Sequence, residues 1–183
     1  MAQQIDRIGF FHFVKDDDQP IPSLKVELKK YHPSEIDGSL IVLPETFNLG
    51  RCYRDSIPGQ FIAATPFLND LADLSRRAGA VFVVSVLEAT PMCRLPYNSA
   101  YLVTPDNGKA PVLMSRKMDP SGLYQAVDQP AGENPLEYGG ICVATAVCAG
   151  LHPLLRREPF RCDQGQPSAA QGPVYSCLYG LNY

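Results

Sequence analysis

The chain has 183 residues, 45% of them hydrophobic, which is enough to bury one sizeable core, so we expect a single domain. The formal net charge of -3 argues against a nucleic-acid partner, because nucleic-acid binders usually carry a basic surplus. No stretch approaches the ~20 apolar residues that span a bilayer, and we expect no secretory signal, because no basic segment leads into a long apolar run near residue 1. We therefore expect a soluble cytoplasmic protein with no membrane partner.

The elements expected in the first part of the chain are strands with turns and a short helix between them. Residues 7–14 and 39–43 are compact apolar runs, which are typical of buried strands. Residues 15–22, with three Asp and two Pro, indicate an exposed turn, and residues 24–31 indicate a short amphipathic helix.

The strongest helical pattern follows at residues 66–78, where four apolar side chains fall on one face and Gly79 ends the helix. The next stretch, residues 80–87, is a β-branched apolar strand. A strand, a helix and a strand joined by short connections favour an α/β fold, in which helices cover a sheet.

Further along the chain, residues 99–104 and 112–115 flank a Pro-Asp-Asn-Gly turn and predict a hairpin. A strong strand is expected at Ile141–Val147, and a helix is expected to begin within residues 151–157. From residue 158 onward Pro, Gln, Gly and Ser dominate, and only residues 174–181 keep an apolar pattern. We expect residues 158–183 to be an irregular tail.

Three residues at the ends of expected strands are candidates for catalysis: Glu45, Lys117 and Cys148. Taken singly, each has an ordinary explanation, as a turn cap, a surface charge or a packed thiol. Together they fall at the strand ends of an α/β chain, where the sites of such sheets usually lie. Cys148 also precedes an expected helix, whose positive end would stabilise a thiolate. A carboxylate could then accept the thiol proton, and an ammonium could offset the charge of a tetrahedral intermediate.

Several segments carry a family resemblance. Residues 41–48 (IVLPETFN) resemble the segment of the carbon-nitrogen hydrolase (nitrilase-like) superfamily in which a buried strand ends in Pro-Glu. Residues 96–105 (PYNSAYLVTP) and 115–118 (SRKM) resemble its strand pair leading to a lysine, and residues 130–148 resemble the stretch that ends in its nucleophile. The blocks occur in the family's order.

The resemblance implies an α-β-β-α sandwich and hydrolysis of a non-peptide carbon-nitrogen bond in an amide, a carbamoyl compound or a nitrile. In family terms Glu45 is the base, Lys117 the stabiliser and Cys148 the acylated nucleophile. Homodimers are common in the family. The family fold continues beyond the cysteine, so we expect residues 1–157 to form an incomplete domain that lacks its C-terminal elements, in a chain truncated or altered after about residue 158.

The sequence departs from the family pattern near the expected nucleophile. Gly150 stands where members usually carry an acid. The family's second glutamate has three candidate replacements here, Gln125, Asp128 and Glu133, of which Glu133 fits best with the turn that follows. His152 could instead form a dyad with the cysteine, although a histidine in a first helical turn is often a cap or a surface residue.

Metal and nucleotide sites have no support in the sequence. No C-x-x-C or H-x-x-x-H spacing occurs, and no glycine-rich phosphate-binding motif is present, so we expect no metal and no cofactor. The six cysteines, at positions 52, 93, 142, 148, 162 and 177, are spread thinly, and reduced thiols are expected.

Two alternatives to the enzyme stay open. The first is a non-catalytic remnant of the same fold, which would act as an interaction protein; the second is a small thiol-rich binding or redox module. A Cys148 that reacts faster than the other cysteines would favour the enzyme.

Overall fold

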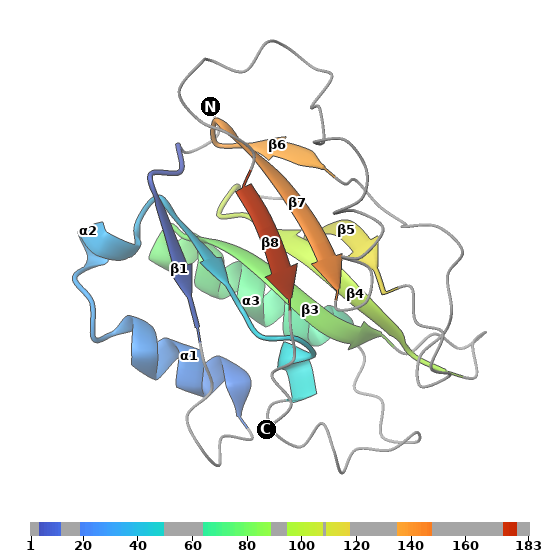
Figure 1. Cartoon of the computed structure of the whole chain (residues 1–183). Helices are drawn as coiled ribbons and strands as arrows, with labels where there is room; N and C mark the ends of the chain where they lie inside the picture. The colour runs from blue at the N-terminus through green and yellow to red at the C-terminus, as the bar shows by residue number, and fades with distance from the viewer. Residues whose placement is uncertain are drawn as a thin grey trace.

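Two β-sheets pack face to face, with helices behind the first sheet (Figure 1). The computed structural model describes residues 4–11, 19–49, 64–88, 95–107, 109–117, 135–147 and, for the backbone alone, 174–178. The first sheet has the order β1-β2-β3-β4-β5. Its strands are β1 (Arg7–Phe10), β2 (Ser39–Val42), β3 (Val81–Glu88), β4 (Tyr97–Val103) and β5 (Val112–Arg116). β1, β2 and β3 are parallel, whereas β4 runs antiparallel to both β3 and β5.

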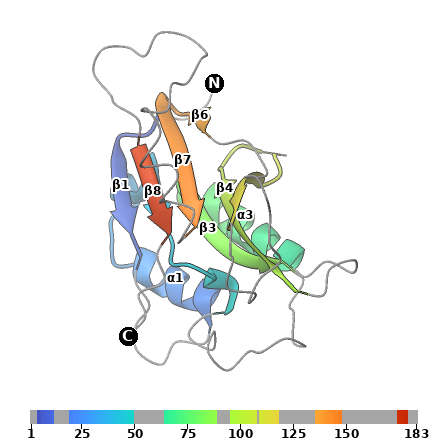
Figure 2. The same cartoon turned by 45° about the vertical axis from the view of Figure 1, so that its right-hand side comes forward.

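The second sheet consists of β6 (Leu136–Tyr138), β7 (Ile141–Val147) and β8 (Val174–Leu178). β6 and β7 are antiparallel, and β8 is parallel to β7. β7 packs over β4 and β5, and β8 packs over β3. In both views the arrows of β1, β7 and β8 point toward the same lower end of the molecule (Figure 1 and Figure 2).

Three α-helices are described: α1 (Pro20–Leu28), α2 (Pro33–Ile36) and α3 (Ala64–Ala78). Two hydrophobic clusters lie on opposite faces of the first sheet. Phe82 and Val84 of β3 pack toward α3, whereas Val81 and Val83 pack toward the second sheet. Every residue of β3 is buried, which is why this strand is an almost unbroken apolar run.

The predicted α/β sandwich of two sheets is confirmed, and the described residues form three of its layers, in the order helix, sheet, sheet. The strand expected at residues 39–43 is present as β2, and the expected strand Ile141–Val147 and the hairpin of β4 and β5 are also present. The helix expected at residues 151–157 lies outside the described residues. β8 falls within the stretch 174–181, where the tail keeps an apolar pattern.

The first helix differs from the expectation, because α1 begins at Pro20, within the segment expected to be a turn. A proline fits the first position of a helix, since its fixed φ is helical and its missing N–H has no partner to lose there. The prolines therefore mark the start of a helix rather than an exposed loop.

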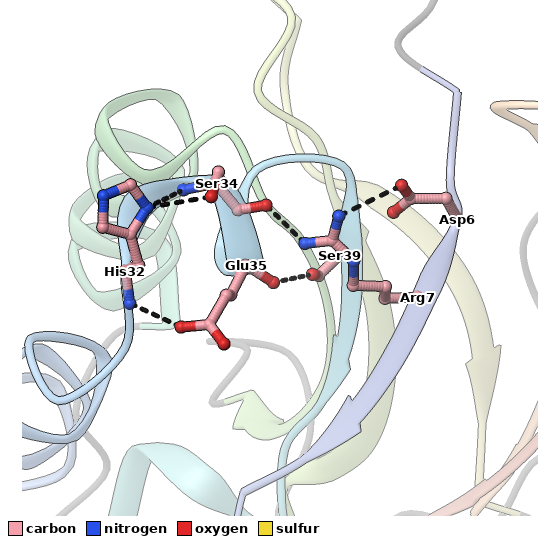
Figure 3. Close-up of polar contacts among 6 residues, drawn as sticks. All are labelled: Asp6, Arg7, His32, Ser34, Glu35 and Ser39. Carbon is pink, nitrogen blue, oxygen red and sulfur yellow. Dashed lines mark hydrogen bonds and ion pairs between the residues drawn. The ribbon is translucent and has the colours of Figure 1, made fainter.

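α2 was not predicted, and its short turn is held by polar side chains (Figure 3). The backbone N–H of His32 donates to Glu35 Oε2 at 2.7 Å, and the N–H of Ser34 donates to the His32 ring at 3.4 Å. Arg7 of β1 donates to the carbonyl of Ser34, and the hydroxyl of Ser39 donates to the carbonyl of Glu35 at 2.9 Å. These contacts fasten α2 to β1 and to the start of β2.

Cys142 is disulfide-bonded, which corrects the expectation of reduced thiols for this residue. The side chain of its partner lies outside the described part of the chain. Among the described helices, none is long and apolar enough to cross a membrane.

Candidate active site

Glu45 lies in a loop immediately beyond β2. The N–H of Leu43 still donates to the carbonyl of Val83 at 2.9 Å, which continues the β2–β3 ladder by one residue. Pro44 has no N–H to donate, so the ladder stops there. Thr46 then takes a positive φ of 53°, which is uncommon for a β-branched residue and often marks a functional site.

The loop that carries Glu45 is anchored on both sides. Phe47 is fully buried and packs edge-to-face against two rings. Its ring centroid lies 5.7 Å from that of Phe11 and 5.9 Å from that of Phe67. Asn48 hydrogen bonds to Leu87 twice: its Nδ2 donates to the Leu87 carbonyl at 3.1 Å, and its Oδ1 accepts from the Leu87 N–H at 2.9 Å. The position of Glu45 is therefore set by the core and by β3.

Glu45 and Lys117 form a buried ion pair. Lys117 Nζ lies 3.1 Å from Glu45 Oε1, and each side chain is only 9% exposed. Lys117 directly follows β5, and its backbone N–H donates to the carbonyl of Asn98 at 2.8 Å. The two residues predicted as base and stabiliser thus come together. Burial strengthens their attraction, because the local dielectric is lower than that of water.

Two further polar residues of the site were not predicted from the sequence. Asn98 Nδ2 donates to Glu45 Oε1 at 2.7 Å, and the hydroxyl of Ser85 donates to Asn98 Oδ1 at 2.5 Å. The N–H of Thr46 donates to the same Ser85 hydroxyl at 3.2 Å. The signal that could have revealed them is their polarity within the apolar runs that form β3 and β4.

Cys148 is the residue after Val147, the last residue of β7, and its own position lies outside the described residues. The hydroxyls of Ser115 and Thr145 lie 2.9 Å apart and join β5 to β7. Ser115 lies two positions before Lys117, and Thr145 lies two positions before Val147, the last residue of β7. The end of β7 is therefore held over the sheet edge that carries Lys117. Gln125, Asp128, Glu133, Gly150 and His152 also lie outside the described part.

A second buried carboxylate, Glu88, ends β3 and lies on the opposite face of β3 and β4. Glu88 Oε2 accepts from the Ser99 hydroxyl at 2.6 Å and from Arg116 Nη2 at 3.1 Å, and Glu88 Oε1 accepts from the Tyr101 hydroxyl. The guanidinium of Arg116 stacks on Tyr97, with Cζ 4.2 Å from the ring centroid. This cluster pins Arg116 on one face of the strand while the next residue, Lys117, meets Glu45 on the other.

The described part of the site places a carboxylate beside an amine, at the carboxyl end of a buried sheet. Such a pair can accept a proton from a neighbouring group and offset a developing negative charge. Among the described residues, no group of three or more His, Cys, Asp or Glu side chains could hold a metal ion.

By sequence, the chain matches no family model and no curated protein. Its structure is similar to that of a CN-hydrolase superfamily protein from Xanthomonas campestris, with a TM-score of 0.55 and 21% identity over 87% of this chain and 56% of that one. An amidase from Nesterenkonia sp. gives a TM-score of 0.50 and 20% identity over 80% and 53% of the two chains. A double mutant of the amidase from Nesterenkonia sp. AN1, solved in complex with acrylamide, gives a TM-score of 0.50 and 16% identity over 80% and 53%.

The chain therefore has the fold of the carbon-nitrogen hydrolase (nitrilase) superfamily, as the resemblance of its segments predicted. It spans 56% and 53% of the lengths of the first two solved chains described above.

Proposed function

We propose that the protein is a thiol hydrolase that cleaves the carbon-nitrogen bond of a small amide, with Cys148 as nucleophile, Glu45 as base and Lys117 as stabiliser. The observation that carries the proposal is the buried Glu45–Lys117 ion pair. It is supported by the packing of β5, which leads to Lys117, against β7, which leads to Cys148. The similarity to an amidase solved with acrylamide supports a small amide as substrate, ahead of carbamoyl compounds and nitriles.

The reaction would proceed in two steps, formation of an acyl-enzyme and its hydrolysis. Glu45 accepts the thiol proton, and the Cys148 sulfur forms a bond to the amide carbon, giving a tetrahedral intermediate. The carbon-nitrogen bond then breaks, the nitrogen leaves with the proton from Glu45, and an acyl-enzyme remains. In the second step Glu45 takes a proton from water, the hydroxide oxygen bonds to the acyl carbon, and the sulfur leaves and regains the proton. Lys117 offsets negative charge in both steps.

A hydrolysis screen tests the proposal. Ammonia or amine release would be measured over simple amides, carbamoyl amino acids and nitriles, with Cys148→Ala, Glu45→Gln and Lys117→Met as site variants. We expect Cys148→Ala to abolish turnover and the loss of the base to cost roughly 10²- to 10⁴-fold. Lys109→Met and Glu137→Gln are matched controls on exposed residues and should leave the rate unchanged.

Thiol labelling gives an independent test. Limiting iodoacetamide followed by peptide mapping should modify Cys148 ahead of the other cysteines, because a thiolate reacts faster than a thiol. Equal or slower labelling of Cys148, together with an empty screen, would favour the non-catalytic interaction protein instead. A cytoplasmic location and a homodimeric state stay predictions from the sequence.

A further inference from the structure

The carboxylate of Glu45 receives two donors on one oxygen. Asn98 Nδ2 lies 2.7 Å and Lys117 Nζ 3.1 Å from the same atom, Oε1. Asn98 is only 1% exposed, so its side chain is shielded from competing water. Two donors on one oxygen restrict how the carboxylate of Glu45 can turn.

The orientation of the Asn98 amide follows from its partners. An amide side chain can be turned so that either its oxygen or its nitrogen faces a neighbour, and the hydrogen-bond network decides between the two. The backbone N–H of Thr46 can only donate, so the Ser85 oxygen accepts there. The Ser85 proton is then available for Asn98 Oδ1, and Nδ2 is turned toward Glu45. The chain of bonds is therefore directed, from the backbone of Thr46 to the carboxylate.

We propose that Asn98, clamped by Ser85, is a positioning residue that holds the carboxylate of Glu45 by Oε1 in the orientation from which it accepts the nucleophile's proton. The inference rests on the proposed function and extends it to two residues that touch neither substrate nor nucleophile in the proposed reaction. Its physical basis is that a base must lie within hydrogen-bonding reach of the proton it takes, so an untethered carboxylate is a poorer base.

Two substitutions remove the tether in different ways. Asn98→Leu keeps a similar volume and removes the donor, while Ser85→Ala leaves the amide in place but removes the group that orients it. We expect Asn98→Leu to lower kcat roughly 10- to 100-fold, the factor carried by a hydrogen bond to a charged group, with KM changed by less than about threefold. If Ser85 acts through Asn98, the double variant should be no slower than Asn98→Leu alone.

Ser99→Ala is the matched control. Ser99 is the next residue of β4 and is also buried, but it donates to Glu88 on the opposite face at 2.6 Å. This variant should lose stability to a similar extent and keep its kcat. A kcat for Asn98→Leu equal to that of Ser99→Ala, each assayed well below its unfolding temperature, would overturn the proposal.

A spectroscopic measurement separates this inference from the proposed function. In protein carrying ¹³C-labelled glutamate, the infrared carboxylate band of Glu45, assigned with Glu45→Gln, reports its hydrogen bonds whether or not a substrate is turned over. The band should shift in Asn98→Leu and Ser85→Ala and stay in place in Ser99→Ala. An unchanged band in Asn98→Leu would refute the positioning role. An inactive wild-type protein with the expected shifts would instead refute only the proposed hydrolysis, and the tether would stand.

Discussion

The hydroxyl oxygens of Ser115 and Thr145 lie 2.9 Å apart between two sheets that pack through a cluster of buried apolar side chains. Both residues are buried, Ser115 at 3% and Thr145 at 1% exposure. This polar contact within an apolar interface fixes the alignment of β7 along β5. The alignment matters because Lys117 and Cys148 follow these two strands.

Replacing Thr145 with valine, which has nearly the same shape, tests this contact. We expect Thr145→Val to lower the free energy of unfolding by about 1–2 kcal/mol, because the buried Ser115 hydroxyl loses this bond. Urea denaturation measures the change. Adding Ser115→Ala should recover part of the loss, and a Thr145→Val protein as stable as the wild type would contradict the assignment.

Replacing only one member of the Glu45–Lys117 pair should strongly destabilise the fold. Because both side chains are buried, Lys117→Met or Glu45→Gln leaves one charge without its counter-charge, and each should destabilise the fold by roughly 3 kcal/mol. Chemical denaturation of both single variants and of the double variant gives the coupling between them. The double variant should cost clearly less than the two single changes added together; simple additivity would argue against a direct pair.

Thr46 offers a test of backbone strain beside the candidate base. Glycine in place of alanine usually destabilises a folded segment, but at a φ of 53° the order should reverse, because a Cβ is strained there. We expect Thr46→Gly to be more stable than Thr46→Ala by about 1 kcal/mol, measured by thermal unfolding. The ordinary order, with alanine the more stable, would show that this φ is not kept in solution.

Tyr138 should make the protein sensitive to alkaline conditions. Burial, and then the negative charge of Asp106, raise the pKa of Tyr138 above its ordinary value of 10.0. The folded state therefore holds the phenol proton more tightly than the unfolded chain, so this contribution to stability is complete below about pH 10 and is lost as the pH rises further.

Tyr138→Phe checks the sign of this effect. The hydroxyl is buried without a hydrogen-bond partner among the described residues, so its removal should leave stability at pH 7 equal or higher. Between pH 9 and about pH 11 the melting temperature of the variant should fall less than that of the wild type. Parallel curves for the two proteins would contradict the prediction.

The sequence predicted those residues of the site that a local sequence pattern marks. Glu45 stands out because a proline stops a buried strand just before it, and Lys117 because it follows an apolar strand. Ser85 and Asn98 are marked only by their polarity within apolar runs, which does not identify their partners, because these lie 39 and 53 residues away, at Thr46 and Glu45. Their roles are created by the pairing of strands, which a local pattern does not encode.

The elements of the fold follow the same rule. α3 and β7 are long and strongly patterned, and the sequence predicts both. β6 has only three residues, too few to show a period, and it exists because it pairs with β7. α2 has four residues and is held by caps and by Arg7, which lies far from it in sequence.

Asn48 gives the end of β3 an unusual source of protection against isotope exchange. The Leu87 amide proton is bound by the Asn48 side chain rather than by a neighbouring strand. In deuterated solvent it should exchange slowly, and Asn48→Ala should speed this one position selectively. The turn that carries Glu45 and the end of β3 would then open as one cooperative unit, so local unfolding of either segment would also expose the other.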